Sequence, residues 1–321
     1  MNQIVFMDLS REEKLIARKL FQLEIHKRSG QAYEDFFVRI MQLSFPEFIP
    51  VKPQGQYGDR KNDGFIKSTG QYYQVYAPQD PSVKEKATIE KLVTDFSGLY
   101  SYWNTQVAPV QEFYFVLNDK YQGAYASLHP ELTKIEKNYN GVKCFPFLAQ
   151  HLEDKFLSLD ITDIEEFLGP IIAPDEVKLF DVSVMNEVIK HLLGSNLPAQ
   201  PDSVPDNPNF DEKIQFNGLS SSVETYLKYG SFQEGELKRY FKINSTFAKT
   251  DLRNVFNKLY KDGLLLIPDG EGKNDLVFFY IMGNAHPTKN QAVSSAILVL
   301  MSYFFSYCDI FEEPVKQNAL F

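Results

Sequence analysis

A carboxylate, an amide and a phenol recur close together near the start of the chain. Asp63 ends the polar stretch 58–64, and Gln74 and Tyr76 lie in the β-rich run that follows. A Ser-Thr-Gly turn at 68–70 joins the two runs, which predicts a β-hairpin. Pairing of these strands would bring Gln74 and Tyr76 back to the end that carries Asp63. Such oxygen donors suit a divalent cation such as Mg²⁺, although the same residues would also suit the polar end of a surface hairpin.

An acidic residue precedes this hairpin on a predicted helix. Residues 31–41 show helical periodicity, and Glu34 lies in the first turn, where an acid can also simply interact with the helix dipole. The order of a helix with Glu, Asp-Gly at a strand and Gln on the next strand resembles the PD-(D/E)XK, or restriction-endonuclease-like, nuclease core that carries Gln in its third motif. Residues 58–64, 73–78 and 308–314 are also similar to the nuclease-like component of bacterial ABC-three-component defence systems, which are related to the Lamassu systems.

The resemblance implies a DNA endonuclease that uses Mg²⁺. Asp63 would be the central ligand, Glu34 a second or water-bridged ligand, and the Gln74 carbonyl a neutral one. Asp59 lies close enough in sequence to contribute. Phosphodiester hydrolysis needs an activated water and neutralisation of the charge that develops on the phosphate, and bound Mg²⁺ supplies both.

The nuclease motif normally ends in a lysine that orients or activates the attacking water, but Tyr76 occupies that position here. A phenol with a pKa near 10 can donate a hydrogen bond but does not supply a cation. Lys67 follows Asp63 by four residues, about 13 Å along a strand, which is too far. Lys84 or Lys86, from the next predicted helix, is the expected substitute. Without such a lysine, the domain would be a degenerate nuclease fold that binds without cutting.

The resemblance also implies partners. Such systems pair the nuclease-like protein with an SMC-like or ABC-type ATPase and a small accessory subunit. Because uncontrolled cleavage would damage the host, the nuclease is expected to be restrained by these partners or activated as a homo-oligomer. A catalytically dead adaptor that holds DNA and partner subunits is the alternative from a different functional class.

The composition limits the function classes. The chain has 321 residues, 44% of them hydrophobic, and a net charge of −9, so a protein that coats nucleic acid is excluded and any DNA contact must be local. Two cysteines, Cys144 and Cys308, form no CxxC pair, and no signal peptide is visible; these features predict a reducing, cytoplasmic location. The five histidines have no zinc-ligand spacing, and no Walker A motif is present.

The succession of helices and strands predicts an α/β fold with a restriction-endonuclease-like mixed sheet flanked by helices in residues 1–169. A helix and a proline-rich linker are expected in 170–209, since prolines recur through 198–208. Residues 210–321 would form a mainly α domain with a winged-helix-like portion, because two short helices precede apolar runs at 264–267 and 276–280 that suggest a hairpin.

The predicted winged helix is locally basic. Residues 226–261 contain eight Lys or Arg and three acidic residues. This surface could contact DNA, or it could be the solvated face of a module that docks to protein. A transcriptional regulator that binds a defined DNA site through the winged helix is a third reading of the chain.

Overall fold

The computed structural model describes residues 10–53, 58–78, 85–169, 171, 181–194, 210–243, 246–287, 290–307 and 309–314. The chain divides into two compact units. We call Glu24–Ile164 the sheet unit, and Met1–Leu23 together with Glu165–Phe321 the helical unit. The predicted first domain, 1–169, ends close to this division, but the structure groups most of α1 (Arg11–Lys27) with the C-terminal part. Much of the predicted linker, 170–209, lies outside the described residues.

The sheet unit contains a five-stranded mixed sheet with the strand order β1-β2-β3-β4-β5. The strands are β1 (Phe48–Pro50), β2 (Gly64–Ile66), β3 (Gln71–Tyr76), β4 (Glu112–Leu117) and β5 (Lys143–Phe147). The first three strands pair antiparallel, and β3, β4 and β5 pair parallel. The predicted hairpin is therefore confirmed as β2–β3, and the predicted α/β class with a mixed sheet is confirmed as well.

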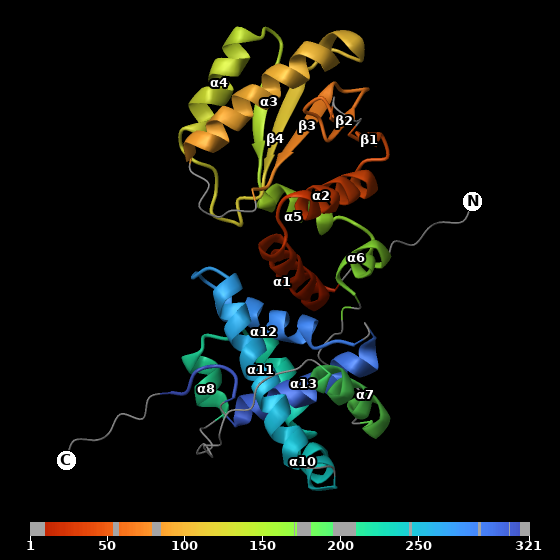
Figure 1. Cartoon of the computed structure of the whole chain (residues 1–321), viewed down its shortest axis with the longest axis vertical. Helices are drawn as coiled ribbons and strands as arrows, with labels where there is room; N and C mark the ends of the chain where they lie inside the picture. Colours follow the sequence, from red (N-terminus) through yellow and green to blue (C-terminus); the bar gives the residue numbers. More distant parts are fainter. Residues whose placement is uncertain are drawn as a thin grey trace, which may run out of the picture. The chain divides into compact units, whose positions relative to one another are not determined.

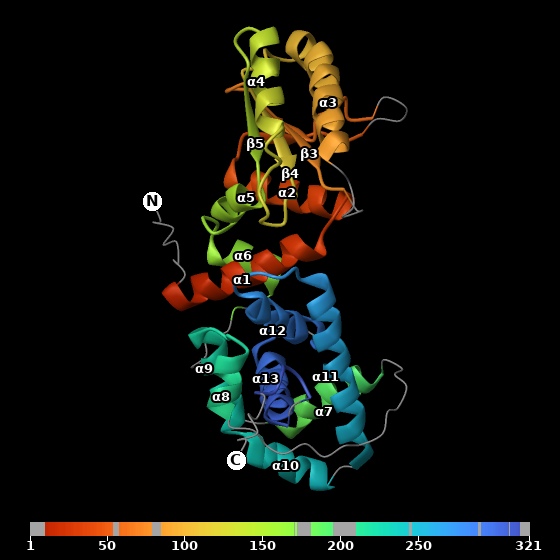
Figure 2. The same ribbon diagram turned by 90° about the vertical axis from the view of Figure 1, so that its left-hand side faces the viewer.

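Helices cover both faces of this sheet, with α3 and α4 on one face and α2 and α5 on the other (Figures 1 and 2). They are α2 (Gln31–Ser44), α3 (Glu85–Gln106), α4 (Leu128–Asn138) and α5 (Ala149–Phe156), followed by α6 (Ile161–Leu168). Apolar residues of α3 spaced by three or four pack on the sheet: Phe96 contacts Phe113 of β4, and Trp103 contacts Phe65 of β2 and Tyr72 of β3. The opposite face is aromatic as well, since Phe37 of α2 contacts Tyr73.

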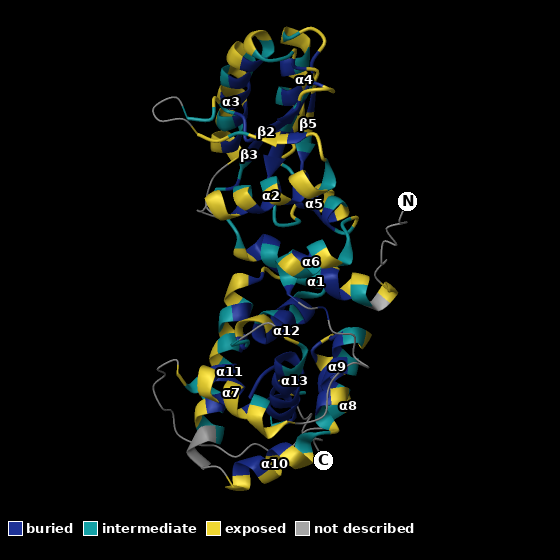
Figure 3. Ribbon diagram, turned by 90° about the vertical axis from the view of Figure 1, so that its right-hand side faces the viewer, coloured by how far each residue is buried: buried dark blue, intermediate teal, exposed yellow. Residues whose placement is uncertain are grey.

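The helical unit is built around α13 (Gln291–Ser306). Every residue of this helix from Val293 to Ser306 is buried (Figure 3). Around it lie α7 (Val182–Leu193), α8 (Phe210–Phe216), α9 (Ser221–Ser231), α10 (Glu234–Ile243), α11 (Thr246–Leu266) and α12 (Lys273–Asn284). Serines do not disturb the apolar surroundings of α13, because the hydroxyls of Ser302 and Ser306 donate to carbonyls four residues earlier. Across the described ranges, no helix is long and apolar enough to pass through a membrane.

The predicted hairpin of the winged helix was wrong. Residues 264–266 complete α11, and 276–280 lie inside α12; the described residues from 210 to 314 contain no strand. A short apolar run is compatible with either a buried strand or a buried helix, and tertiary packing decided the outcome here. Phe278 and Phe279 both contact Tyr226 of α9, so two neighbouring positions of α12 are buried at once. The mainly α character predicted for this part is confirmed.

Candidate metal centre

The β2–β3 hairpin places Asp63 beside Gln74. Gly64 is paired with Tyr73, so Asp63, the residue before β2, lies opposite Gln74. The Asp63 Oδ2 atom accepts hydrogen bonds from Gln74 Nε2 at 2.9 Å and from the Val75 amide at 2.5 Å. Asp63 is 2% exposed and Gln74 5% exposed. The structure thus brings together the two residues that the sequence predicted at this end of the hairpin, and it buries both.

Two further carboxylates act on Asp63. Burial, the negative charges of Glu34 and Asp59 and a hydrogen bond between the Asp63 and Asp59 side chains together raise the pKa of Asp63 to about 8, against the opposing effect of the hydrogen bond from the Val75 amide. Glu34 lies in the first turn of α2, where burial raises its pKa and a hydrogen bond from Gln31 opposes that shift. Three acids therefore repel one another at a largely buried site. A cation would reverse this repulsion.

The donors fit a hard divalent cation. The Gln74 Oε1 atom is buried and has no hydrogen-bond partner. An unpaired buried acceptor is unfavourable, and a carboxylate with an amide oxygen is the donor set that Mg²⁺ prefers. Within the described ranges, no three His, Cys, Asp or Glu side chains are grouped as metal ligands. An ion at this site would therefore depend on Gln74 as well as on Asp63 and Glu34.

The loop before Asp63 is held in an unusual backbone conformation. Arg60 and Lys61 have φ values of 57° and 63°, which are uncommon for residues other than glycine. The Asp59 carboxylate accepts a hydrogen bond from the Lys61 amide at 2.7 Å, and the Trp103 indole donates to the Arg60 carbonyl at 3.2 Å. Strained backbone persists where the surroundings impose it, and it is concentrated at functional sites. Here α3 imposes the position of the loop that carries the acids.

A second charged cluster, which the sequence did not predict, adjoins this loop. Asp95 of α3 is fully buried, and its carboxylate pairs with Lys61 Nζ at 3.3 Å and Lys91 Nζ at 2.5 Å. A Cβ at Gly98 would lie 2.9 Å from the Lys61 Cγ atom, so the glycine leaves room for the lysine stem. Asp95 raises the pKa of Lys61. A buried acid in the amphipathic helix 85–106, four residues after Lys91, is the sequence signal that could have revealed the cluster.

The predicted substitute lysines are not part of this cluster. Lys84 lies outside the described residues, and Lys86 is exposed and pairs with Glu90 of its own helix. Tyr76 ends β3 on the same face as Gln74, where its ring stacks on Phe115. Burial raises the pKa of Tyr76, and a hydrogen bond with Thr88 opposes that shift.

The C-terminal stretch 308–314 has a structural role. Cys308 lies outside the described residues, while Asp309 is buried and forms an ion pair with Arg253 of α11. The Glu312 carboxylate accepts a hydrogen bond from Tyr260 at 3.1 Å. Five of the basic side chains predicted to form a DNA-binding face are also paired with acids: Lys228, Lys238, Arg239, Arg253 and Lys258.

Comparison with known proteins identifies the C-terminal part. Residues 183–312, which include α7 to α13, match the family described as C-terminal domain 10 of the ABC-three component (ABC-3C) systems. No curated protein and no solved structure matches the chain. The match confirms the system predicted from the sequence and concerns the helical unit alone. The match covers less than half of the chain, and it places residues 183–312 among the C-terminal domains of ABC-three-component systems, a family of anti-phage defence systems.

Proposed function

We propose that the sheet unit is a Mg²⁺-dependent DNA endonuclease and that the chain is the effector of its ABC-3C system. The observation that carries the proposal is the buried Asp63–Gln74 pair, whose Gln74 Oε1 atom lacks a partner and whose carboxylate lies beside Glu34 and Asp59. A mixed sheet with helices on both faces is compatible with the restriction-endonuclease-like core.

The residues of the chain have separate roles in this proposal. Asp63 and Glu34 hold the ion through carboxylate oxygens, and Gln74 contributes its amide oxygen. When bound, Mg²⁺ neutralises charge on the phosphate and lowers the pKa of a coordinated water. Asp63 must lose its proton to act as a ligand, so the site binds the ion more tightly as the pH rises through about 8.

Lys61 is the best candidate for the cation that Tyr76 cannot supply. It belongs to the same loop as Asp59 and Asp63, and its side chain is 44% exposed, so its ammonium group is reachable by a phosphate. Asp95 keeps that group charged by raising its pKa. Lys91, on the other side of Asp95, is the second candidate.

Plasmid cleavage tests the proposal. Full-length protein is incubated with supercoiled plasmid and Mg²⁺ or EDTA, alone and with the ATPase subunit of the same system. We expect Mg²⁺-dependent nicking that Asp63→Asn and Gln74→Ala abolish and Lys61→Met reduces at least tenfold. Asp35→Asn, an exposed acid next to Glu34 on α2, is the matched control and should cleave normally. Equal cleavage by Asp63→Asn and the unaltered protein would refute the assignment.

One observation favours a second function, a nuclease-fold adaptor that holds DNA and partners without cutting. Tyr76 stands where the motif lysine is expected, and Lys61 is already paired with Asp95. The adaptor predicts DNA binding that persists in EDTA, together with no cleavage under any of the conditions above.

We also propose that the helical unit docks the chain to the SMC-like or ABC-type ATPase rather than to DNA. Five basic side chains of the candidate DNA-binding face form ion pairs with acids, as described above, so the net positive charge of this face is smaller than its number of Lys and Arg residues. Large apolar side chains of this unit are instead exposed: Phe232 by 81%, Ile243 by 83% and Leu265 by 87%. A protein partner that covers Phe232 would remove its exposed ring from water. Phe232→Ser should weaken co-purification with the ATPase subunit, and the exposed Lys261→Ser in the same unit should not.

A further inference from the structure

A cavity of about 310 Å³ lies at the carboxyl ends of β3 and β4. Tyr76 and Leu117, the last residues of these parallel strands, line it together with Thr88 of α3 and the segment that follows β4. Crevices at the carboxyl ends of parallel strands are common ligand sites in α/β proteins. Tyr76 is two residues after Gln74 on the same face of β3, a separation of about 6.6 Å along the strand.

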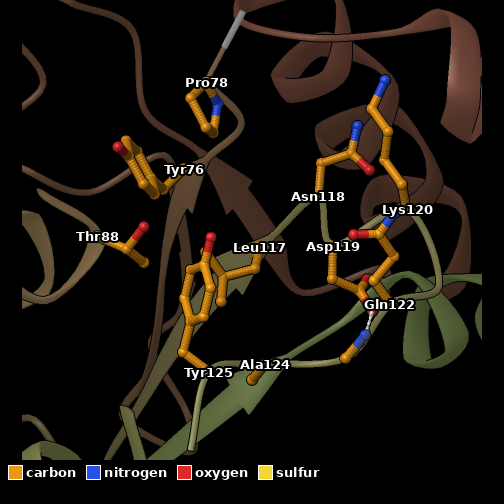
Figure 4. A pocket seen from close by; sticks show the side chains of 11 residues that line it. Tyr76, Pro78, Thr88, Leu117, Asn118, Asp119, Lys120, Gln122, Ala124 and Tyr125 are labelled. Atoms are coloured by element: carbon orange, nitrogen blue, oxygen red, sulfur yellow. Dashed lines mark hydrogen bonds between the residues drawn. The ribbon is translucent and has the colours of Figure 1, made fainter. Parts of the chain in front are cut away.

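The cavity has one aromatic side and one polar side. Figure 4 shows Tyr76, Tyr125 and Thr88 on one side, and Asn118, Asp119 and Gln122 across the opening. Tyr125 is 43% exposed and close enough to Tyr76 to affect its pKa. On the polar side, the Asn118 Oδ1 atom is buried and has no hydrogen-bond partner. A flat ligand could stack on the tyrosines while its polar edge reaches the amides.

The polar side of the cavity is fixed in place. Lys120 and Tyr121 have φ values of 48° and 62°, a conformation that residues other than glycine rarely adopt. The Asp119 carboxylate holds this loop by accepting hydrogen bonds from the amides of Gly123 and Ala149, at 2.9 and 2.8 Å. Strained residues held by so many contacts are typical of pre-organised sites.

The charges of the lining argue against an ionic ligand. Among the residues that the structure describes, Asp119 and Lys120 are the charged ones that line the cavity. The Lys120 Nζ atom donates to the His26 carbonyl at 2.6 Å, and burial lowers the pKa of Lys120. From the described part of the lining, a lone phosphate would therefore meet one lysine and one aspartate, with no excess of positive charge. A neutral, planar ring with hydrogen-bonding edges fits the aromatic and amide surfaces.

We infer that this cavity binds the base of an unpaired nucleotide in a nucleic-acid strand. The inference rests on the proposed nuclease function and deepens it: a phosphate at Asp63 and Gln74 would place a neighbouring nucleotide next to Tyr76. The substrate of the site is then a strand with at least one unstacked base, such as a single strand or a flap. Stacking on Tyr125 and Tyr76 supplies most of the binding, since base stacking on aromatic side chains does not depend on sequence.

The test uses the full chain in EDTA, so that binding is measured without cleavage. A single-stranded oligonucleotide carrying 2-aminopurine is titrated with protein, and the fluorescence of this base reports its stacking. We expect Tyr125→Ala to bind about tenfold more weakly and Tyr125→Phe, which keeps the ring, to bind within about twofold of the unaltered chain. Tyr229→Ala, which removes a half-exposed tyrosine of the helical unit, is the matched control.

Three results would overturn the inference. The first is that Tyr125→Ala binds the oligonucleotide as tightly as the unaltered protein does. The second is that a fully paired duplex binds as tightly as the single strand. The third is that a free 2-aminopurine nucleotide binds as tightly as the oligonucleotide. Asp63→Asn separates this inference from the proposed reaction, because it should keep the fluorescence change in EDTA while losing cleavage in Mg²⁺. Base binding without any cleavage by the unaltered protein would refute the nuclease and leave the cavity assignment standing.

Discussion

Replacing Asp63 with asparagine should stabilise the sheet unit at alkaline pH and change its stability little near pH 4. Asparagine keeps an oxygen to accept the hydrogen bonds from Gln74 and Val75, and its amide group can donate to Asp59. It has no charge to bury next to Glu34 and Asp59. The variant therefore removes the ionisation of Asp63 and preserves its shape and its main contacts.

The size of the effect follows from the pKa of Asp63, which burial raises from 3.8 to about 8. The native state binds this proton more tightly than the unfolded chain does, so the stabilisation is complete below pH 4 and is lost as the pH rises to about 8. Each pH unit in this window costs about 1.4 kcal/mol relative to asparagine. The limit for the whole window is about 6 kcal/mol in the free energy of unfolding.

Urea unfolding at several pH values measures this difference. Trp103 is the single tryptophan of the chain and lies buried in the sheet unit, so its fluorescence reports the unfolding of the unit that contains Asp63. Asp35→Asn, which removes an exposed acid from α2, should show no comparable pH dependence. A difference between Asp63→Asn and the unaltered protein that stays constant from pH 5 to pH 9, or that reverses sign, would refute the reasoning.

Three other substitutions test the packing of the two units. Asp95→Asn should destabilise the sheet unit by about 2 kcal/mol in urea unfolding followed by Trp103 fluorescence, because Lys61 and Lys91 lose their carboxylate. An effect no larger than that of the exposed Lys86→Met would contradict this expectation. Gly64→Ala should lower the melting temperature and cost about 2 kcal/mol, since the new Cβ would lie 2.1 Å from the Phe48 ring. Lys213→Met should cost the helical unit about 3 kcal/mol in thermal unfolding followed by circular dichroism, because Lys213 Nζ donates to the Phe305 and Ile310 carbonyls; unchanged unfolding would show that these bonds contribute nothing net.

The sheet unit could be predicted where its signals were local. The hairpin of β2 and β3 followed from two β-rich runs and the turn between them, and the position of Asp63 beside Gln74 followed from the hairpin. The apolar residues between 89 and 103 recur at intervals of three and four, a local pattern that indicates a helix with one buried side, as α3 is. In each case the information lay within about 20 residues, so long-range packing was not needed to read it.

The features that were missed depend on packing between distant segments. Lys61 lies in a loop and Asp95 in a helix 34 residues later, and no local sequence pattern in either segment indicates that the two side chains form an ion pair. The hairpin predicted at 264–280 failed for the same reason, since α11, α13 and Tyr226 of α9 bury the run 276–282 as a helix. Lys84 follows Gln74 closely in the sequence, whereas Lys61 is held by the Asp95 carboxylate of α3 and is close enough to Asp59 for that acid to raise its pKa.

The two charged clusters differ in a way that bears on function. Asp95 is buried with two lysines, so its charge is compensated by the chain itself. Asp63 is buried with Glu34 and Asp59, and its pKa of about 8 means that the chain alone does not compensate the charge. Asparagine at position 63 would serve a purely structural role at lower energetic cost. A ligand that reverses the penalty would account for a buried acid that destabilises the free protein, and the divalent cation that we propose beside the unpaired Gln74 oxygen would do so.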